Sequence, residues 1–153
     1  DSDFGPLNRE PRARSDFYVN SSGEVMPSTA FRYMDSRFAD RTMKSRSAPA
    51  SYFGFERLSS ASEARDRFQI FFEPGNPASW SDARLVGEFD TLQLFDGQGR
   101  SRATVPLERG GLGPDLEPIV SSYPEYGRGG AVQLKADGLL HFRSVEMIPE
   151  NPQ

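Results

Sequence analysis

The sequence predicts an α+β domain in which a mostly antiparallel, curved sheet carries a few short helices on or beside it. Three observations predict this class. Short β-prone runs are separated by turns that contain glycine or proline along most of the chain. Ser60 and Glu63 form a capping-box signature that starts a helix. Apolar and polar residues alternate over residues 84–96, which indicates a strand.

The length of 153 residues is enough for one domain with its own core. Residues 1–15 are polar, rich in proline and arginine and without apolar periodicity, so we expect a linker to a longer carrier. The start without methionine agrees with a piece cut from a longer protein. Residues 16–149 then form the domain and residues 150–153 a frayed tail. No apolar run is long enough for a membrane span, and no secretory signal pattern opens the chain.

The composition excludes several kinds of chemistry. Without cysteine there is no disulfide, thiolate metal site or cysteine nucleophile, and His141 alone cannot form a multi-histidine zinc site or a catalytic histidine pair. We therefore expect no metal. The net charge of −4 disfavours general attraction to nucleic acid. Arginines outnumber lysines sixteen to two; the arginine fork suits phosphate binding, but the codon usage of a GC-rich genome is the better explanation of the excess.

The first predicted element after the linker is a hairpin. Residues 17–19 and 24–26 are β-prone and flank residues 20–23, which contain glycine. Farther along, residues 35–49 are polar, with three arginines and one lysine, and part of them predicts a short helix. This charge cluster suits a pyrophosphate or simply a solvated face.

Residues 28–34 predict a strand in which Phe31 and Tyr33 face one side and Arg32 the other. An arginine flanked by aromatic residues is partly shielded from water, which strengthens its hold on an anion. A surface arginine beside core aromatics is the alternative. Residues 50–56 predict a second, buried strand, in which Gly54 indicates a close approach to the backbone.

Helix and loop signals follow. The capping box predicts a helix over residues 61–69, after which Phe68 and the next aromatics enter the core. Residues 73–77 break the chain, and Trp80 follows in a loop, either as a lid or stacking residue or as a loop anchor.

The later elements are mostly strands. After the strand over residues 84–96, a turn leads to residues 103–105, which we expect to pair back as a hairpin. Residues 115–122 predict a short helix, and residues 139–148 the last strand. His141 lies on the other face of that strand from Leu140.

The stretch from Tyr123 to Leu134 combines aromatic residues and glycines with Gln133, at the start of a predicted strand. Glycine tolerates positive φ and lets another molecule approach the backbone, so the stretch predicts a ligand shelf or an ordinary turn. If it met Arg32, Ser51 and Tyr52, the set would hold a pyrophosphate, stack on a base and bond a ribose hydroxyl. Cleavage of the N-glycosidic bond of NAD suits such a site, because it needs orientation and electrostatics more than a strong nucleophile.

The segment Tyr126-Gly-Arg-Gly-Gly-Ala-Val-Gln133 is similar to an aromatic-Gly-x-x-Gly-Gly-x-x-Gln motif. With the arginine strand and the aromatic-glycine strand before it, the order over residues 29–142 resembles the NAD-cleaving toxin domains of the tuberculosis necrotizing toxin family. That family has an ADP-ribosyltransferase-like fold. The resemblance implies that Gln133 is the ribose-side catalytic residue and Arg32 the phosphate-holding one. It makes Tyr52 or Phe53 the nicotinamide-side wall. The remaining expected NAD(P)-binding residues are Ser51, Tyr126, Gly129 and Gly130.

Residues 87–93 and 116–133 also resemble C-terminal domains of bacterial polymorphic toxins of the Rhs and contact-dependent inhibition kind. This resemblance implies a cognate immunity protein as partner and translocation from the producing cell into the cytoplasm of a target cell.

Three functions remain open from the sequence. The first is an NAD(P) glycohydrolase toxin, with transfer of ADP-ribose to a macromolecule as a variant; the lack of an acidic residue just before Gln133 favours hydrolysis. The second is an RNA-cleaving toxin in which Glu125 or His141 is the base. The third is a non-catalytic interaction module that uses the aromatic residues.

Overall fold

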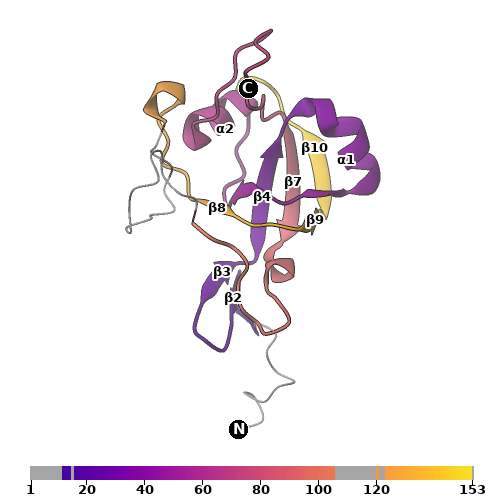
Figure 1. Ribbon diagram of the computed structural model, residues 1–153, viewed down its shortest axis with the longest axis vertical. Helices are drawn as coiled ribbons and strands as arrows, with labels where there is room; N and C mark the ends of the chain where they lie inside the picture. Colours follow the sequence, from indigo (N-terminus) through magenta and orange to yellow (C-terminus); the bar gives the residue numbers. More distant parts are fainter. Residues whose placement is uncertain (1–11, 15, 106–119, 121–122, 153) are drawn as a thin grey trace.

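The computed structural model describes residues 12–14, 16–105, 120 and 123–152, and these form an α+β fold of antiparallel sheets with short helices (Figure 1). The strands are β1 (Arg12–Arg14), β2 (Phe17–Val19), β3 (Val25–Pro27), β4 (Thr29–Met34), β5 (Ser47–Pro49), β6 (Tyr52–Gly54), β7 (Leu85–Asp90), β8 (Gln133–Lys135), β9 (Leu139–His141) and β10 (Ser144–Met147). The helices are α1 (Ala39–Ser45) and α2 (Ala61–Phe68), with 3₁₀ turns η3 (Ser36–Phe38), η4 (Thr91–Leu94) and η5 (Pro124–Tyr126).

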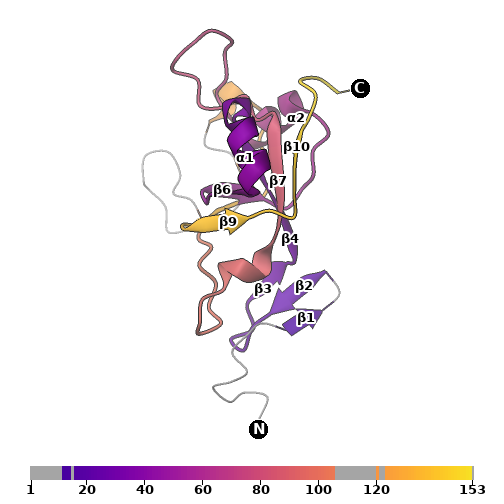
Figure 2. The ribbon, with the colours of Figure 1, turned by 90° about the vertical axis from the view of Figure 1, so that its right-hand side faces the viewer.

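The main sheet has five strands in the order β10-β7-β4-β6-β8. All its pairings are antiparallel, so the predicted class is confirmed. Strands β5 and β9 pair separately. A third sheet, β1-β2-β3, lies at the end of the molecule where the chain begins (Figure 2). No helix within the described part of the chain is long and apolar enough to cross a membrane.

The predicted hairpin is confirmed as β2 and β3, with Tyr18 paired to Met26. Asn20 shapes its turn, because the side-chain oxygen accepts hydrogen bonds from the backbone of Ser22 (3.1 Å) and Glu24 (2.8 Å). Residues 12–14, predicted as part of the linker, instead form β1 and pair with β2. The rest of the predicted linker lies outside the described residues.

Two apolar clusters cover the two faces of the main sheet. On the face covered by α1, β5 and β9, hereafter the α1 face, the cluster includes Ala30, Met34 and Phe53. On the opposite face, hereafter the α2 face, the second cluster includes Phe31 of β4 and Phe68 of α2. The division follows from the alternation of side chains along each strand.

Helix α2 begins where the capping box predicted. Ser60 is fully buried, and its hydroxyl accepts a hydrogen bond of 3.3 Å from the backbone of Glu63, so one free N–H group of the first turn is satisfied. Ala64 and Phe68 then face the sheet as part of the α2-face cluster. The helix ends at Gln69, which adopts a left-handed conformation with φ of 54°.

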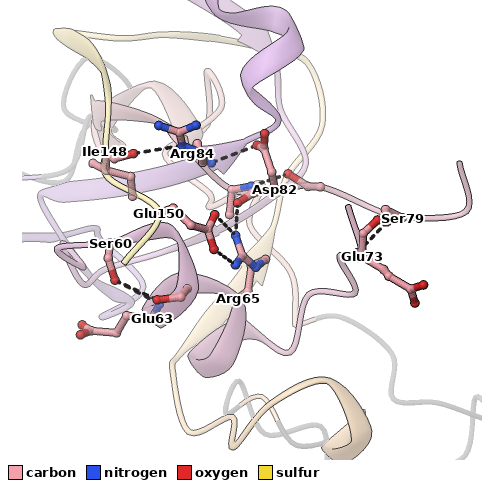
Figure 3. Close-up of polar contacts among 12 residues, drawn as sticks. Ser60, Glu63, Arg65, Glu73, Ser79, Asp82, Arg84, Ile148 and Glu150 are labelled. Atoms are coloured by element: carbon pink, nitrogen blue, oxygen red, sulfur yellow. Dashed lines mark hydrogen bonds and ion pairs between the residues drawn. The ribbon is translucent and has the colours of Figure 1, made fainter. Parts of the chain in front are cut away.

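The end of the chain contacts this helix. The carbonyl groups of Pro149 and Glu150 accept hydrogen bonds from Ala61 (2.7 Å) and Ser62 (2.8 Å). The Glu150 carboxylate also forms a bidentate ion pair with the guanidinium of Arg65 (Figure 3). A frayed tail was predicted from residue 150, whereas Glu150 is bound to α2.

Two predicted strands are shorter than their patterns. The prediction for residues 84–96 is wrong beyond Asp90, where η4 begins. The Asp90 carboxylate accepts a hydrogen bond from the backbone of Leu92 (2.9 Å) and caps that turn. Thr91 donates its hydroxyl to the carbonyl of Pro27 (2.6 Å), which fixes the change of direction.

The last predicted strand is broken between β9 and β10. Phe142 donates its N–H to Arg46 (2.7 Å), and Arg143 donates to Glu88 (2.8 Å), so the chain passes from one sheet to another. The expected hairpin around residues 96–99 keeps one bridge, between Phe95 and Ser101. Farther on, the chain leaves it, and Thr104 bridges β8 instead. The predicted helix over residues 115–122 lies outside the described residues apart from 120.

Candidate functional site

The register of β4, β6 and β8 decides which predicted site residues meet. Phe31 pairs with Gly54, and Gly54 pairs with Gln133. Directly paired residues of antiparallel strands point to the same face. Gln133 therefore lies on the α2 face with Phe31, whereas its neighbour Leu134, paired with Phe53, packs against the α1-face cluster.

Arg32 lies on the other face. It follows Phe31 in β4 and shares the phase of Ala30 and Met34, both of the α1-face cluster. It is half-buried, and its Nε donates a hydrogen bond of 3.1 Å to the carbonyl of Pro49. Burial lowers the pKa of its guanidinium, and no carboxylate among the described residues pairs with it. The structure does not bring Arg32 together with Gln133.

Tyr52 and Gln133 do share a face. Tyr52 is 45% exposed and pairs directly with Lys135, whose Nζ lies 5.3 Å from the centre of the tyrosine ring. Gln133 is half-buried and lies two residues before Lys135, on the same side of β8. Ser51 precedes β6, and its carbonyl accepts a hydrogen bond from Ala136 (3.1 Å). An aromatic ring, an amide and an ammonium group thus lie on one exposed margin of the sheet.

Phe53 is part of the core. It is 2% exposed, and its ring makes edge contacts with Phe55 and Phe89 at centroid distances of 5.7 and 5.5 Å. Of the two residues that the resemblance offers as the nicotinamide-side wall, Phe53 is therefore buried in this structure and does not present its ring at the surface. Tyr52, which points the opposite way, keeps its accessible ring.

The glycines after Tyr126 serve packing against α2. A Cβ on Gly127 would lie 2.3 Å from the Asp66 carbonyl oxygen, and one on Gly129 would lie 2.4 Å from that of Val120. Gly129 also has a positive φ of 73°, which favours glycine. Its N–H donates to Asp66 (2.8 Å), and that of Gly130 donates to Val120 (2.9 Å). The amides of Gly129 and Gly130, which a ligand shelf would offer, are therefore already bonded within the protein.

Gly54 confirms the predicted close approach to the backbone. A Cβ there would lie 2.6 Å from the Phe68 ring and 2.8 Å from the carbonyl oxygen of Val132. The approaching group is therefore another part of the protein and not a ligand.

The sequence analysis does not identify Gln69, but this residue holds in place the loop of residues 123–130 that contains the glycines. Its side chain is 2% exposed, donates 3.0 Å to the Gly127 carbonyl and accepts 2.7 Å from the backbone of Tyr123. A polar residue directly before the apolar run that follows a helix is the only sequence signal for it. Through these bonds α2 positions the loop that leads into β8 and Gln133.

Trp80 and Tyr126 meet in an aromatic cluster. Their ring centres lie 5.2 Å apart, and Phe71 and Tyr123 complete the cluster. The rings of Tyr126 and Phe71 lie 4.9 Å apart with their planes tilted by 31°, and Tyr126 is half-buried. Trp80 is 48% exposed. This arrangement supports the loop-anchor interpretation of Trp80.

The structure also describes His141 and Glu125, the two candidate bases of the RNA-cleaving alternative. His141 is exposed, and its main chain exchanges two hydrogen bonds with the side chain of Gln93, of 2.8 and 3.0 Å. Glu125 lies in η5, exposed. Within the described ranges, there is no group of three or more His, Cys, Asp or Glu side chains that could hold a metal ion.

No protein-family model, curated protein or solved structure matches this chain.

Proposed function

We propose that this domain cleaves the N-glycosidic bond of NAD(P), with Tyr52 and Gln133 at the reacting end of the substrate. The observation that supports the proposal is that both residues lie on the α2 face, on paired strands, and that both are accessible. Tyr52 offers a ring that stacks on nicotinamide, and the Gln133 amide orients a ribose hydroxyl.

The reaction fits these groups. Nicotinamide leaves as a neutral molecule from a cationic ring, so its departure needs no acid. The ribose develops oxocarbenium character, and held dipoles stabilise it better than mobile water does. Positioning by stacking and by one amide lowers the barrier by fixing the reactants. Water then completes the hydrolysis.

The strand order also supports an ADP-ribosyltransferase-like fold. The three segments of the resemblance, with Arg32, Tyr52 and Gln133, fall on β4, β6 and β8, which are neighbours in the main sheet. Under this proposal the domain acts as a toxin in the cytoplasm of a target cell, and a cognate immunity protein protects the producer. Transfer of ADP-ribose to a macromolecule is the variant with a different acceptor.

The test measures nicotinamide released from NAD and NADP by the purified domain. We expect release by the parent and a loss of at least about 100-fold in Gln133→Ala, since one oriented group in a transition state contributes about this much. Gln98→Ala, in an exposed turn, is the matched control and keeps full activity. Intact NAD with folded parent protein would reject the proposal, and degradation of cellular RNA under the same conditions would support the ribonuclease alternative.

A further inference from the structure

We propose that Lys135 is the cation that binds the phosphates of the substrate, in the role that the resemblance implied for Arg32. The inference rests on the proposed function, because it assigns a dinucleotide phosphate to the same face. The ammonium group of Lys135 lies on the same face of the sheet as Tyr52 and Gln133, whereas Arg32 lies on the opposite, α1 face.

The pairing of Lys135 with Tyr52 brings their side chains close together. The N–H and the carbonyl of Lys135 both bond to Thr104, at 2.8 Å each. They therefore point away from β6, and Lys135 and Tyr52 form a pair without mutual hydrogen bonds. Side chains approach most closely in such pairs. The 5.3 Å from Nζ to the ring centre agrees with this geometry.

The bridge to Thr104 also fixes the lysine backbone from its second side. Strand β8 ends the order of the main sheet, yet at Lys135 it is held between β6 and Thr104. Only the side chain of Lys135 is left to move, and it is exposed. A fixed backbone with a flexible cationic stem suits the binding of a phosphate as a point charge.

The charge of Lys135 is not neutralised within the described part of the chain. Asp137, two residues on, pairs with Arg102 at 3.2 Å, and Glu56, near the end of β6, pairs with Arg67 at 3.2 Å. Asp137, the nearest carboxylate to Lys135 in the sequence, and Glu56, four residues after Tyr52, thus have partners of their own. Lys135 contacts the Tyr52 ring instead, which leaves its ammonium group available to an anion.

Lys44 provides the contrast. It is the other lysine of the chain, is exposed, and lies in the last turn of α1, where a positive charge offsets the helix dipole. Among the described residues, no aromatic ring lies against Lys44 as Tyr52 lies against Lys135. The two lysines therefore differ in surroundings but not in chemistry, and Lys44 serves as an internal control.

The experiment measures the binding of ADP-ribose by calorimetry to the parent, Lys135→Met, Lys135→Arg and Lys44→Met. We expect Lys135→Met to weaken binding by about tenfold, which corresponds to one charge-assisted contact. Lys135→Arg keeps most of the affinity, and Lys44→Met binds like the parent. Added salt weakens binding to the parent more than binding to Lys135→Met.

Equal affinity in the parent and Lys135→Met, or no binding of ADP-ribose by the parent, overturns the inference. The outcome for the function is separate. A parent that binds ADP-ribose through Lys135 but releases no nicotinamide supports this site and rejects the reaction. A parent that releases nicotinamide equally well with and without Lys135, at the same KM, supports the reaction and rejects the role of Lys135.

Discussion

Arg32 and Gln133 lie on opposite faces of the main sheet, although only β6 separates their strands. Gln133 shares the face of Phe31 through Gly54, and Arg32 is the residue after Phe31. Arg32 therefore contributes to the α1 face by its contact with Pro49 and not to a site with Gln133. This relationship separates the part of the predicted site that assembles from the part that does not.

Arg32→Met should change the free energy of unfolding by less than about 1 kcal/mol. The variant loses one hydrogen bond to Pro49, which contributes about 1 kcal/mol, but it also removes a charge from a half-buried position. Urea unfolding of the two proteins measures the difference. A loss of several kcal/mol would mean that Arg32 is paired more strongly than its contact with Pro49 indicates.

Gly127→Ala should destabilise the protein by about 3 kcal/mol or more. The new Cβ would lie 2.3 Å from the Asp66 carbonyl oxygen and 2.7 Å from the Asp66 Cα. These atoms belong to the backbone of α2, and moving a helix backbone to relieve the clash costs free energy. Gly97→Ala is the matched control, since nothing lies within 4 Å of its Cβ position. It should be neutral or stabilise by up to about 1 kcal/mol. Equal stability of the two variants, measured by thermal unfolding, would contradict the packing of the loop on α2.

Gln69→Leu should cost about 1–3 kcal/mol, because it leaves the Gly127 carbonyl and the Tyr123 N–H without their partner. It should also change the fluorescence of Trp80, whose ring contacts Tyr123 at 5.1 Å. Gln98→Leu, on an exposed turn, should change neither stability nor fluorescence. A Gln69→Leu protein as stable as the parent would show that the loop is held by other contacts.

The Glu150–Arg65 pair should make stability depend on pH. The hydrogen bond from Arg65 holds the pKa of the Glu150 carboxyl below its usual value of 4.5. Because the pKa is lower in the folded protein, the stabilisation is present above about pH 4.5 and is lost as the pH falls through the folded-state pKa. Glu150→Gln should therefore be less stable than the parent at pH 6, with the difference shrinking towards pH 3.

Urea unfolding at pH 6, 4.5 and 3 measures this difference. Glu73→Gln changes an exposed carboxylate of the neighbouring turn (Figure 3) and should track the parent at each pH. A gap between the parent and Glu150→Gln that stays constant down to pH 3 would show that the carboxylate charge does not stabilise the fold.

Local signals in the sequence predicted local structure well. Ser60 caps α2 as its spacing to Glu63 indicated, and the turn at residues 20–23 forms through Asn20. These elements depend on residues a few positions apart. Alternation along residues 84–96 was misleading, because the bond from Thr91 to Pro27 ends the strand and joins residues far apart in sequence.

The site was predictable only in part for the same reason. The alternation of side chains along residues 28–34 correctly placed Arg32 on the other face of the strand from Phe31. The three segments on which the resemblance rests are neighbouring strands of the main sheet. The register that pairs Phe31 with Gly54 and Gly54 with Gln133 depends on tertiary packing, and a shift of one residue moves a side chain to the other face. No pattern within one strand contains that information. The glycines likewise indicated a close approach without identifying α2 as the approaching group.

The most direct test compares nicotinamide release from NAD by the parent, Gln133→Ala and Arg32→Met in one assay. We predict that the parent and Arg32→Met release nicotinamide at rates within about threefold of each other, and that Gln133→Ala is slower by about 100-fold or more. Folded Arg32→Met that has lost activity together with Gln133→Ala would contradict the separation of the two residues by the sheet. Folded parent protein that leaves NAD intact would contradict the proposed function itself.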